Sequence, residues 1–205
     1  MNQIYEQKLW GGTDSDFYSG IGSHKPEIIS PYLEALVAFL VSQNNALVVC
    51  DLGCGDFNIG KYLTKHTKKY IAVDIVENLI IRNKKQFQAD NLEFHNLDIS
   101  KDTLPAGDCI IIRQVLQHLC NAEIKKVVNK IANYKYVILT EHIPSGEFIP
   151  NIDIISGQGI RIKQHSGVNL LAPPFNLKIE NKKVIDCYIL ENNKGRLVTT
   201  IYKIF

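Results

Sequence analysis

Three aspartates recur at nearly equal intervals in the first half of the sequence, each at the end of a short apolar run. Asp51 and Asp74 are 23 residues apart, and Asp98 follows 24 residues later. Gly53 and Gly55 come directly after the first acid, within VVCDLGCGDFNIG. Glycines let a ligand approach the backbone closely because they carry no Cβ, and carboxylates accept hydrogen bonds from hydroxyl and amino groups. The pattern therefore predicts a binding site for a ligand that carries such groups.

The elements that must position these acids alternate between strand and helix up to residue 142. Apolar β-branched runs predict five buried strands, and the segments between them have apolar residues at helical spacing. The expected strands cover residues 46–52, 69–75, 91–99, 108–114 and 134–142, and the expected helices cover 30–42, 58–66, 77–89 and 121–134. This alternation is typical of a doubly wound α/β fold, in which ligands bind at the carboxyl ends of parallel strands.

The last part of the chain departs from this alternation. VIDCYILE and RLVTTIYKIF are separated by NNKG, which predicts an antiparallel hairpin. The expected fold is therefore a seven-stranded, mainly parallel sheet that a C-terminal β-hairpin closes, in a single domain. We divide this domain into an N-terminal cover and helix (1–43), a ligand-binding core (44–142), an irregular substrate loop (143–178) and the hairpin (179–205).

Two helix starts carry capping signals. Ser30 is expected to cap the first helix with Pro31 at its first position, and residues 1–25 before it are expected to form an ordered but irregular cover. Asn121 is expected to cap the helix over 121–134, with Glu123 in its first turn.

Cysteine usage does not indicate a metal site or a disulfide framework. The chain has five cysteines, an odd number, and Cys50 and Cys54 have no second close pair with which to complete a structural zinc site. We expect reduced thiols, and we expect Cys54 to contribute its backbone rather than its sulfur to the predicted ligand site.

Bulk properties exclude several broad classes. The net charge of +2 gives no strong electrostatic footprint for nucleic acid or for a membrane surface. No apolar run reaches the length of a transmembrane helix, and the first twelve residues contain no stretch of signal-peptide type, so we expect a cytoplasmic protein.

The acids and the glycine turn resemble those of the class I S-adenosylmethionine-dependent methyltransferases. That family's D/E-x-G-x-G turn is matched by Asp51, Gly53 and Gly55, its second-strand acid by Asp74 and its third-strand acid by Asp98. The resemblance covers the expected strands and the hairpin, about three quarters of the chain. The stretch YKYVILTEH is also similar to small bacterial methyltransferases, some of which act in surface-carbohydrate or secondary-product pathways.

This resemblance implies a Rossmann-like fold, S-adenosylmethionine as the cofactor and S-adenosylhomocysteine as the product. It implies that Asp74 accepts the ribose hydroxyls, that Asp98 accepts the adenine amino group, and that Asp51 orders the loop near the cationic end. The expected cofactor-binding residues are Asp51, Gly53, Cys54, Gly55, Asp74, Ile75, Asp98, Ile99 and Arg113.

Three stretches differ from patterns found in such enzymes. Phe57 stands where a further glycine is common. RQVLQHL resembles a magnesium-binding E-V-x-E-H stretch, but Gln114 and Gln117 replace its glutamates, and amides are weaker magnesium ligands than carboxylates, so no metal is expected. LAPPFN resembles the motif of adenine-amino methyltransferases, but Ala172 replaces the amine-holding residue, which argues against a nucleic-acid substrate.

Proton removal from an acceptor hydroxyl requires a base, and histidine titrates near neutral pH. His118 is slightly preferred over His142, because helical spacing would place His118 beside Gln114. The residues expected to face the substrate are Tyr18, Ser23, His24, Gln114, Glu141 and Arg161.

The sequence thus favours an enzyme that methylates a small molecule, through O-methylation of a sugar or a related metabolite, acting as a monomer or homodimer. Two alternatives stay open. One is a NAD(P)-linked reductase, although Asn58 replaces the third glycine of the dinucleotide fingerprint. The other is a non-catalytic protein that has kept the cofactor pocket.

Overall fold

The computed structural model describes residues 5, 7–9, 11 and 17–205. The expected irregular cover over residues 1–25 falls partly outside these described residues, at positions 1–4, 6, 10 and 12–16. The chain divides into two compact units, residues 1–99 with 105–107, and residues 100–104 with 108–205. The expectation of a single domain stays a prediction.

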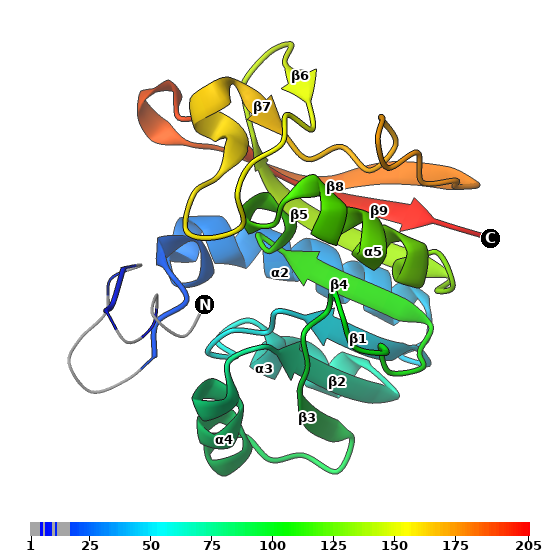
Figure 1. The fold of residues 1–205 in the computed structure, drawn as a ribbon. Coiled ribbons are helices and arrows are strands. Elements are labelled where there is room, and N and C mark those ends of the chain that lie inside the picture. Colours follow the sequence, from blue (N-terminus) through cyan, green and yellow to red (C-terminus); the bar gives the residue numbers. More distant parts are fainter. Residues whose placement is uncertain (1–4, 6, 10, 12–16) are drawn as a thin grey trace. The chain divides into compact units, whose positions relative to one another are not determined.

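The described residues of the first unit form parallel strands and helices (Figure 1). Strands β1 (Val48–Leu52), β2 (Lys69–Asp74) and β3 (Leu92–Asn96) pair in parallel, with β2 between the other two. The helical elements are η1 (Ile21–Ser23), α2 (Pro26–Ser42), α3 (Gly60–Leu63), η2 (Thr64–His66) and α4 (Glu77–Gln86). Helix α4 packs against β2 and β3, so the acid that ends β2 lies next to the start of this helix.

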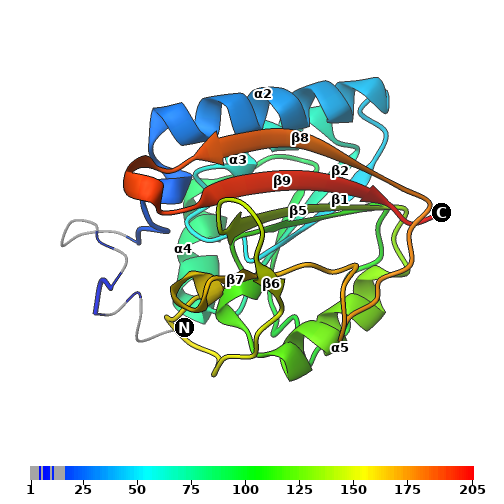
Figure 2. The same cartoon turned by 90° about the horizontal axis from the view of Figure 1, so that it is seen from above.

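The second unit contains the hairpin and the long irregular segment (Figure 2). Strands β4 (Cys109–Arg113) and β5 (Tyr136–Ile143) pair in parallel, and β9 (Arg196–Lys203) pairs antiparallel with both β5 and β8 (Asn181–Ile189). The other elements are η3 (Leu116–His118), α5 (Asn121–Ile131), β6 (Ile149–Pro150), η4 (Arg161–Gln164), β7 (Ser166–Gly167) and η5 (Glu191–Asn193).

The main sheet has seven strands in the order β3-β2-β1-β4-β5-β9-β8. This order and the antiparallel C-terminal hairpin confirm the expected Rossmann-like fold class. Residues 143–178 are irregular, as expected, apart from η4 and the two-residue strands β6 and β7.

The first long helix begins earlier than Ser30. Helix α2 starts at Pro26, with Lys25 as its N-cap, and Pro31 lies inside it. The buried residues of α2 are Ile28, Tyr32, Leu36 and Leu40, a stripe of spacing four that begins before Ser30. Burial of Ile28 explains the earlier start, because a helix is fixed mainly by packing of its apolar face.

The expected cap of α5 is also wrong. Cys120 is the N-cap, and Asn121 is the first helical residue, whose side chain bonds to Asn151 O and to Arg161. The first backbone N–H groups of α5 are capped by side chains far along the chain rather than by a neighbouring residue. Asn121 N donates to Asp153 Oδ1 and Cys120 N donates to Ser156 Oγ, both at 2.7 Å. Glu123 lies in the first turn, as expected.

Candidate active site

The glycine turn after β1 is fixed by hydrogen bonds to the end of β2. Gly53 N and Cys54 N both donate to Val73 O, at 2.8 and 2.9 Å, and Gly55 N donates to Asp74 Oδ2 at 3.1 Å. Gly55 has φ +55°, and a Cβ on it would lie 2.3 Å from Ser19 Oγ. Both the left-handed backbone and the close neighbour therefore require glycine at this position.

Phe57 accounts for the departure from the glycine-rich pattern. It has φ +63°, a conformation in which glycine is normally favoured. Its ring is fully buried and makes edge contacts with Tyr70, Phe87 and Phe94 at centroid distances of 4.9–5.8 Å. This burial offsets the backbone strain, and the packed ring of Phe57 holds the turn against the core.

Every backbone amide from Gly53 to Asn58 has an acceptor within the first unit. Beyond the three bonds above, Asp56 N donates to Ser19 Oγ, Phe57 N to Cys54 O, and Asn58 N to Asp56 Oδ1. A pyrophosphate on such a turn needs open amides. The turn therefore suits a ligand that is held by acids rather than by phosphate contacts.

Two of the three acids lie in strands and are buried. Asp51 Oδ2 accepts a hydrogen bond from Tyr70 OH at 2.8 Å, and Asp74 Oδ1 accepts one from Val76 N at 3.0 Å. Burial raises the pKa of Asp74, while the amides of Val76, Gly55 and Ile75 act in the opposite direction. Each carboxylate oxygen has two acceptor sites, so Asp74 retains capacity for hydroxyl donors beside these amides.

The sequence predicts that Asp98 ends the third strand, and this is wrong, because β3 ends at Asn96. The chain turns there, since Asn96 Nδ2 and Leu97 N both donate to Asp74 O, at 3.0 and 3.1 Å. This contact brings the segment that carries Asp98 and Ile99 to Asp74. Ile75, directly after Asp74, is 45% exposed and offers an apolar surface beside the acid.

The N-terminal residues expected to face a substrate lie against the glycine turn. His24 Nε2 is 2.6 Å from Asp56 Oδ2, and its ring stacks on Tyr18 at a centroid distance of 4.3 Å. Ser23 O accepts a hydrogen bond from Asn58 Nδ2 at 2.7 Å. Sequence reasoning missed Asp56 and Ser19, because no local pattern links residues 37 positions apart.

In the second unit, Gln114 and His118 are not neighbours on a helix. Gln114 has φ +56° and lies in a turn after β4, where its backbone N–H donates a hydrogen bond to Thr140 O. Its Oε1 accepts a hydrogen bond from Arg113 Nη1 at 3.1 Å. His118 ends the short 3₁₀-helix η3, so the expected i, i+4 relation is wrong.

Gln117 fixes the tautomer of His118. Its Oε1 accepts a hydrogen bond from His142 N at 3.2 Å, so its Nε2 is the donor that faces His118 Nε2, also at 3.2 Å. His118 Nε2 is therefore an acceptor, and the proton of the neutral ring is on Nδ1. Burial lowers the pKa of His118, which favours this neutral form.

His142 has the opposite tautomer. Its Nε2 is 2.5 Å from Lys194 O, and a carbonyl only accepts, so Nε2 carries the proton. Burial lowers the pKa of His142, and the carbonyl of Lys194 acts against this shift. The lone pair on Nδ1 has no partner among the described residues. The ring is thus neutral, oriented and able to accept a proton.

Glu141 and Arg161 are the buried charged groups of the same region. Neither carboxyl oxygen of Glu141 makes a hydrogen bond of good geometry to a described residue. Burial raises the pKa of Glu141 to about 8, although the charge of Arg161 and the nearby amides of Leu116 and Gln117 lower it. Glu141 is therefore mainly protonated at neutral pH.

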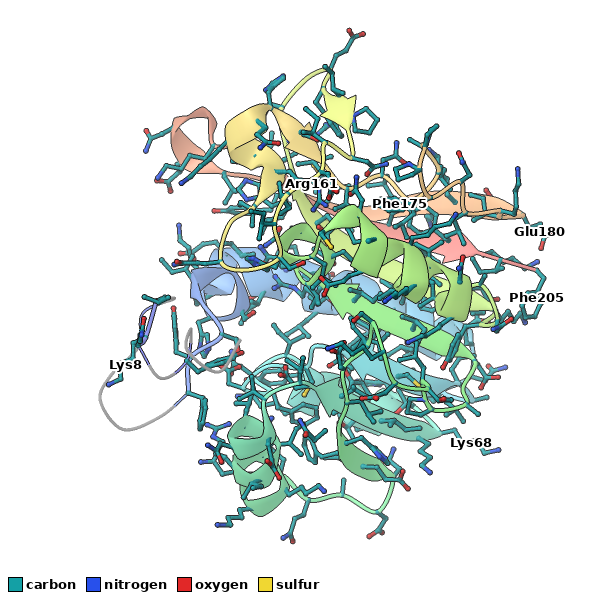
Figure 3. The ribbon with its side chains drawn as sticks, in the orientation of Figure 1. Lys8, Lys68, Arg161, Phe175, Glu180 and Phe205 are labelled. Carbon is teal, nitrogen blue, oxygen red and sulfur yellow. The ribbon has the colours of Figure 1, made fainter. Side chains whose placement is uncertain are left out.

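Arg161, which the sequence predicts to face the substrate, is buried. Its side chain is 1% exposed and lies between η4 and the start of α5 (Figure 3). Its guanidinium donates to Ile152 O, Leu119 O and Asn121 Oδ1 at 2.8–2.9 Å. Arg161 therefore fastens the irregular segment to the loop before α5.

The structure thus gathers the sequence-predicted residues into two sets. The first unit brings together Asp51, Gly53, Cys54, Gly55, Asp74, Tyr18 and His24, and the second brings together His118, Glu141 and His142 through Gln117 and η3. The described residues contain no group of three or more His, Cys, Asp or Glu side chains arranged to hold a metal ion. None of the helices in the described part of the chain is long and apolar enough to cross a membrane.

Comparisons with known proteins give a matching family model and solved structures of the same fold. Residues 50–134 match a family model described as "Methyltransferase domain". No curated protein sequence matches the chain.

Solved structures share the fold at low sequence identity. N-methyltransferase NodS from Bradyrhizobium japonicum WM9, in complex with S-adenosyl-L-homocysteine, is 14% identical with a TM-score of 0.69, over 98% of this chain and 97% of that one. Magnesium protoporphyrin IX methyltransferase ChlM from Synechocystis PCC 6803, with bound S-adenosylmethionine, is 17% identical with a TM-score of 0.57, over 97% and 89%. Human N-acetylserotonin methyltransferase is 14% identical with a TM-score of 0.56, over 89% and 51%. The names of ChlM and of the human enzyme indicate different acceptors on one fold.

Proposed function

We propose that this chain, whose residues 50–134 match a family model described as "Methyltransferase domain", is a class I S-adenosylmethionine-dependent methyltransferase that methylates a hydroxyl group of a small-molecule acceptor, such as a sugar or a related metabolite. S-adenosylmethionine is the cosubstrate. When bound, it supplies an electrophilic methyl group on a sulfonium centre. The acceptor oxygen attacks the methyl carbon, the C–S bond breaks, and its electron pair stays on sulfur.

The residues of the first unit fit this cosubstrate by the chemistry of their donors and acceptors. The ligand presents ribose hydroxyls and an adenine amino group, and it carries no phosphate. We assign the hydroxyls to Asp74, the amino group to Asp98, the cationic end to the neighbourhood of Asp51, and the apolar contacts of the adenine to Ile75 and Ile99. The closed set of turn amides supports this ligand over a dinucleotide.

We assign proton removal to His142 rather than to His118. The observation that carries this assignment is the pair of tautomers: His118 Nε2 accepts from Gln117, whereas His142 Nδ1 keeps its lone pair. A hydrogen bond from Nε2 to Lys194 O orients the ring, as an orienting partner does in other histidine bases. The proton leaves the acceptor hydroxyl for Nδ1 as the O–CH₃ bond forms.

Glu141, Gln114 and Arg113 are proposed to contribute to acceptor and cofactor contacts at the ends of β4 and β5. Glu141 in its protonated form is both a donor and an acceptor for a polar substrate. The acceptor is proposed to be small, as the magnesium porphyrin and N-acetylserotonin of the solved neighbours are.

A labelled methyl-transfer screen tests the function. The protein is incubated with methyl-labelled S-adenosylmethionine and with nucleotide sugars, phosphorylated sugars, small phenols and amino sugars in separate reactions. We expect label on the oxygen of one class of hydroxyl acceptor. Label on nitrogen alone would show that the protein is an N-methyltransferase and that the proposed O-methylation is wrong. Binding of the cofactor without turnover on any acceptor would favour the non-catalytic alternative.

A further inference from the structure

Residues 17–24, here called the N-terminal strap, are joined to the glycine turn by a reciprocal pair of hydrogen bonds. Ser19 N donates to Asp56 Oδ2 at 2.9 Å, and Asp56 N donates back to Ser19 Oγ at 2.8 Å. His24 Nε2 approaches the same carboxylate oxygen at 2.6 Å. One buried carboxylate, 4% exposed, therefore holds the strap at Ser19 and at His24.

The strap is in direct contact with the backbone of the turn. The space that a Cβ on Gly55 would fill is occupied by Ser19 Oγ, 2.3 Å away. Tyr5 extends the contact, because its hydroxyl is 3.1 Å from Ser19 Oγ. The pKa of Tyr5 is raised by burial and then by the charge of Asp74, so the phenol lies near the acid assigned to the ribose.

Asp56 is held in place by helix α4 and by the turn to which it belongs. Its carbonyl oxygen accepts a hydrogen bond from Arg82 Nη1 of α4 at 2.8 Å, and its Oδ1 accepts one from Asn58 N at 3.2 Å. Asn58 in turn donates through Nδ2 to Ser23 O of the strap at 2.7 Å. The backbone of Asp56 is therefore fixed by α4, its carboxylate is oriented by the turn, and the strap is attached to that carboxylate.

We infer that Asp56 is a positioning residue that latches the N-terminal strap over the glycine turn and so closes one side of the cofactor site. The inference rests on the proposed function, because that function assigns the cofactor to this turn. Asp56 acts through Ser19 and His24. Exchange of S-adenosylhomocysteine for S-adenosylmethionine then requires the strap to detach from the carboxylate.

The test measures dissociation of S-adenosylhomocysteine by stopped-flow fluorescence, with affinity by calorimetry. Asp56→Asn removes the charge but keeps an acceptor, Ser19→Ala removes one hydroxyl, and His24→Phe keeps a ring on Tyr18 but removes the bond to Asp56. We expect the dissociation rate to rise about tenfold in Asp56→Asn and by less in the other two, since hydrogen bonds to charged groups are the strongest of those removed. The matched control is Glu93→Gln, which breaks the exposed ion pair with Lys69 in the same unit.

A role confined to fold stability would lower the unfolding temperature without changing the dissociation rate of the folded protein. The double variant His24→Phe with Asp56→Asn separates the two roles. If His24 acts through Asp56, the double variant releases ligand no faster than Asp56→Asn alone. Equal dissociation rates in the wild type and all variants, or additive effects in the double variant, would overturn the inference. Failure of the wild type to bind either ligand would instead overturn the proposed function.

Discussion

Glu141 carries its carboxyl in a buried site where ionisation is unfavourable. Its pKa is raised from 4.5 to about 8 in the folded protein. Between these two pH values the folded state binds more protons at this residue than the unfolded state, so its contribution to stability falls as pH rises. At about 1.4 kcal/mol for each pKa unit, the loss is a few kcal/mol at most.

Glu141→Gln is therefore expected to gain stability relative to the wild type as pH increases from 5 to 9. The amide has nearly the shape of the protonated acid, but it does not ionise. Urea unfolding at several pH values measures the difference in free energy of unfolding. If the variant instead becomes relatively less stable with rising pH, an ion pair between Glu141 and Arg161 outweighs the cost of burial.

His142 is expected to matter more for turnover than His118. His142→Ala should lower kcat by about 10²–10⁴-fold and leave cofactor affinity nearly unchanged, because it removes a proton acceptor used only in the reaction. The control is His165→Asn. His165 is exposed and has a left-handed backbone conformation, which asparagine tolerates. Should His118→Ala alone produce the loss, the base is His118 and the tautomer argument is wrong.

At the scale of elements, the sequence predicted which segments are strands more accurately than where the helices begin. Strands β1, β2, β4 and β5 lie within a few residues of their apolar runs, because such runs must be buried in a parallel sheet. The starts of α2 and α5 differ from the predicted ones. Burial of Ile28 extends α2 toward the N-terminus, and hydrogen bonds to Asp153 and Ser156 hold the start of α5. These side chains lie far along the chain or depend on packing, so capping patterns did not reveal them.

The glycine turn offers a stability test of the packing beneath it. A Cβ on Gly60 would lie 2.2 Å from the ring of Phe57, so Gly60→Ala requires that ring to move. We expect a loss of about 1–3 kcal/mol in the free energy of unfolding, as is usual when a packed core is overfilled. Gly159→Ala is the matched control, because nothing lies within 4 Å of the added methyl group.

A smaller residue beneath the turn should restore much of this loss. The double variant Gly60→Ala with Phe57→Leu is expected to be less destabilised than the sum of the single variants, since leucine leaves room for the new methyl group. Equal stability of Gly60→Ala and Gly159→Ala in chemical unfolding would contradict the packing argument.

At the scale of the whole molecule, the acids and the fold class could be predicted, and the contacts between distant segments could not. Asp51 and Asp74 were found because strand ends and glycine turns have local patterns. The attachment of the strap to the turn was missed because Ser19 and Asp56 meet only in the folded chain. The burial of Arg161 was not predicted, because a buried arginine and an exposed one look the same in a loop sequence.

Turnover is expected to be independent of added metal. The amide oxygens of Gln114 and Gln117, where a magnesium site would need carboxylates, accept hydrogen bonds from Arg113 and from His142 N. Activity should therefore be unchanged in EDTA. Loss of activity in EDTA that Mg²⁺ restores would contradict this expectation.

The most direct measurement is the affinity of S-adenosylhomocysteine, by calorimetry, for the wild type, Asp74→Ala and Asp90→Ala. Asp74 is the buried acid assigned to the ribose hydroxyls, and Asp90 is an exposed aspartate of the same unit. Loss of about 2 kcal/mol or more, roughly 30-fold in Kd, is expected for Asp74→Ala, with no change for Asp90→Ala and no binding of NADH to the wild type. Unchanged affinity in Asp74→Ala, or binding of NADH in preference to S-adenosylhomocysteine, would contradict the assignment of the cofactor to this turn.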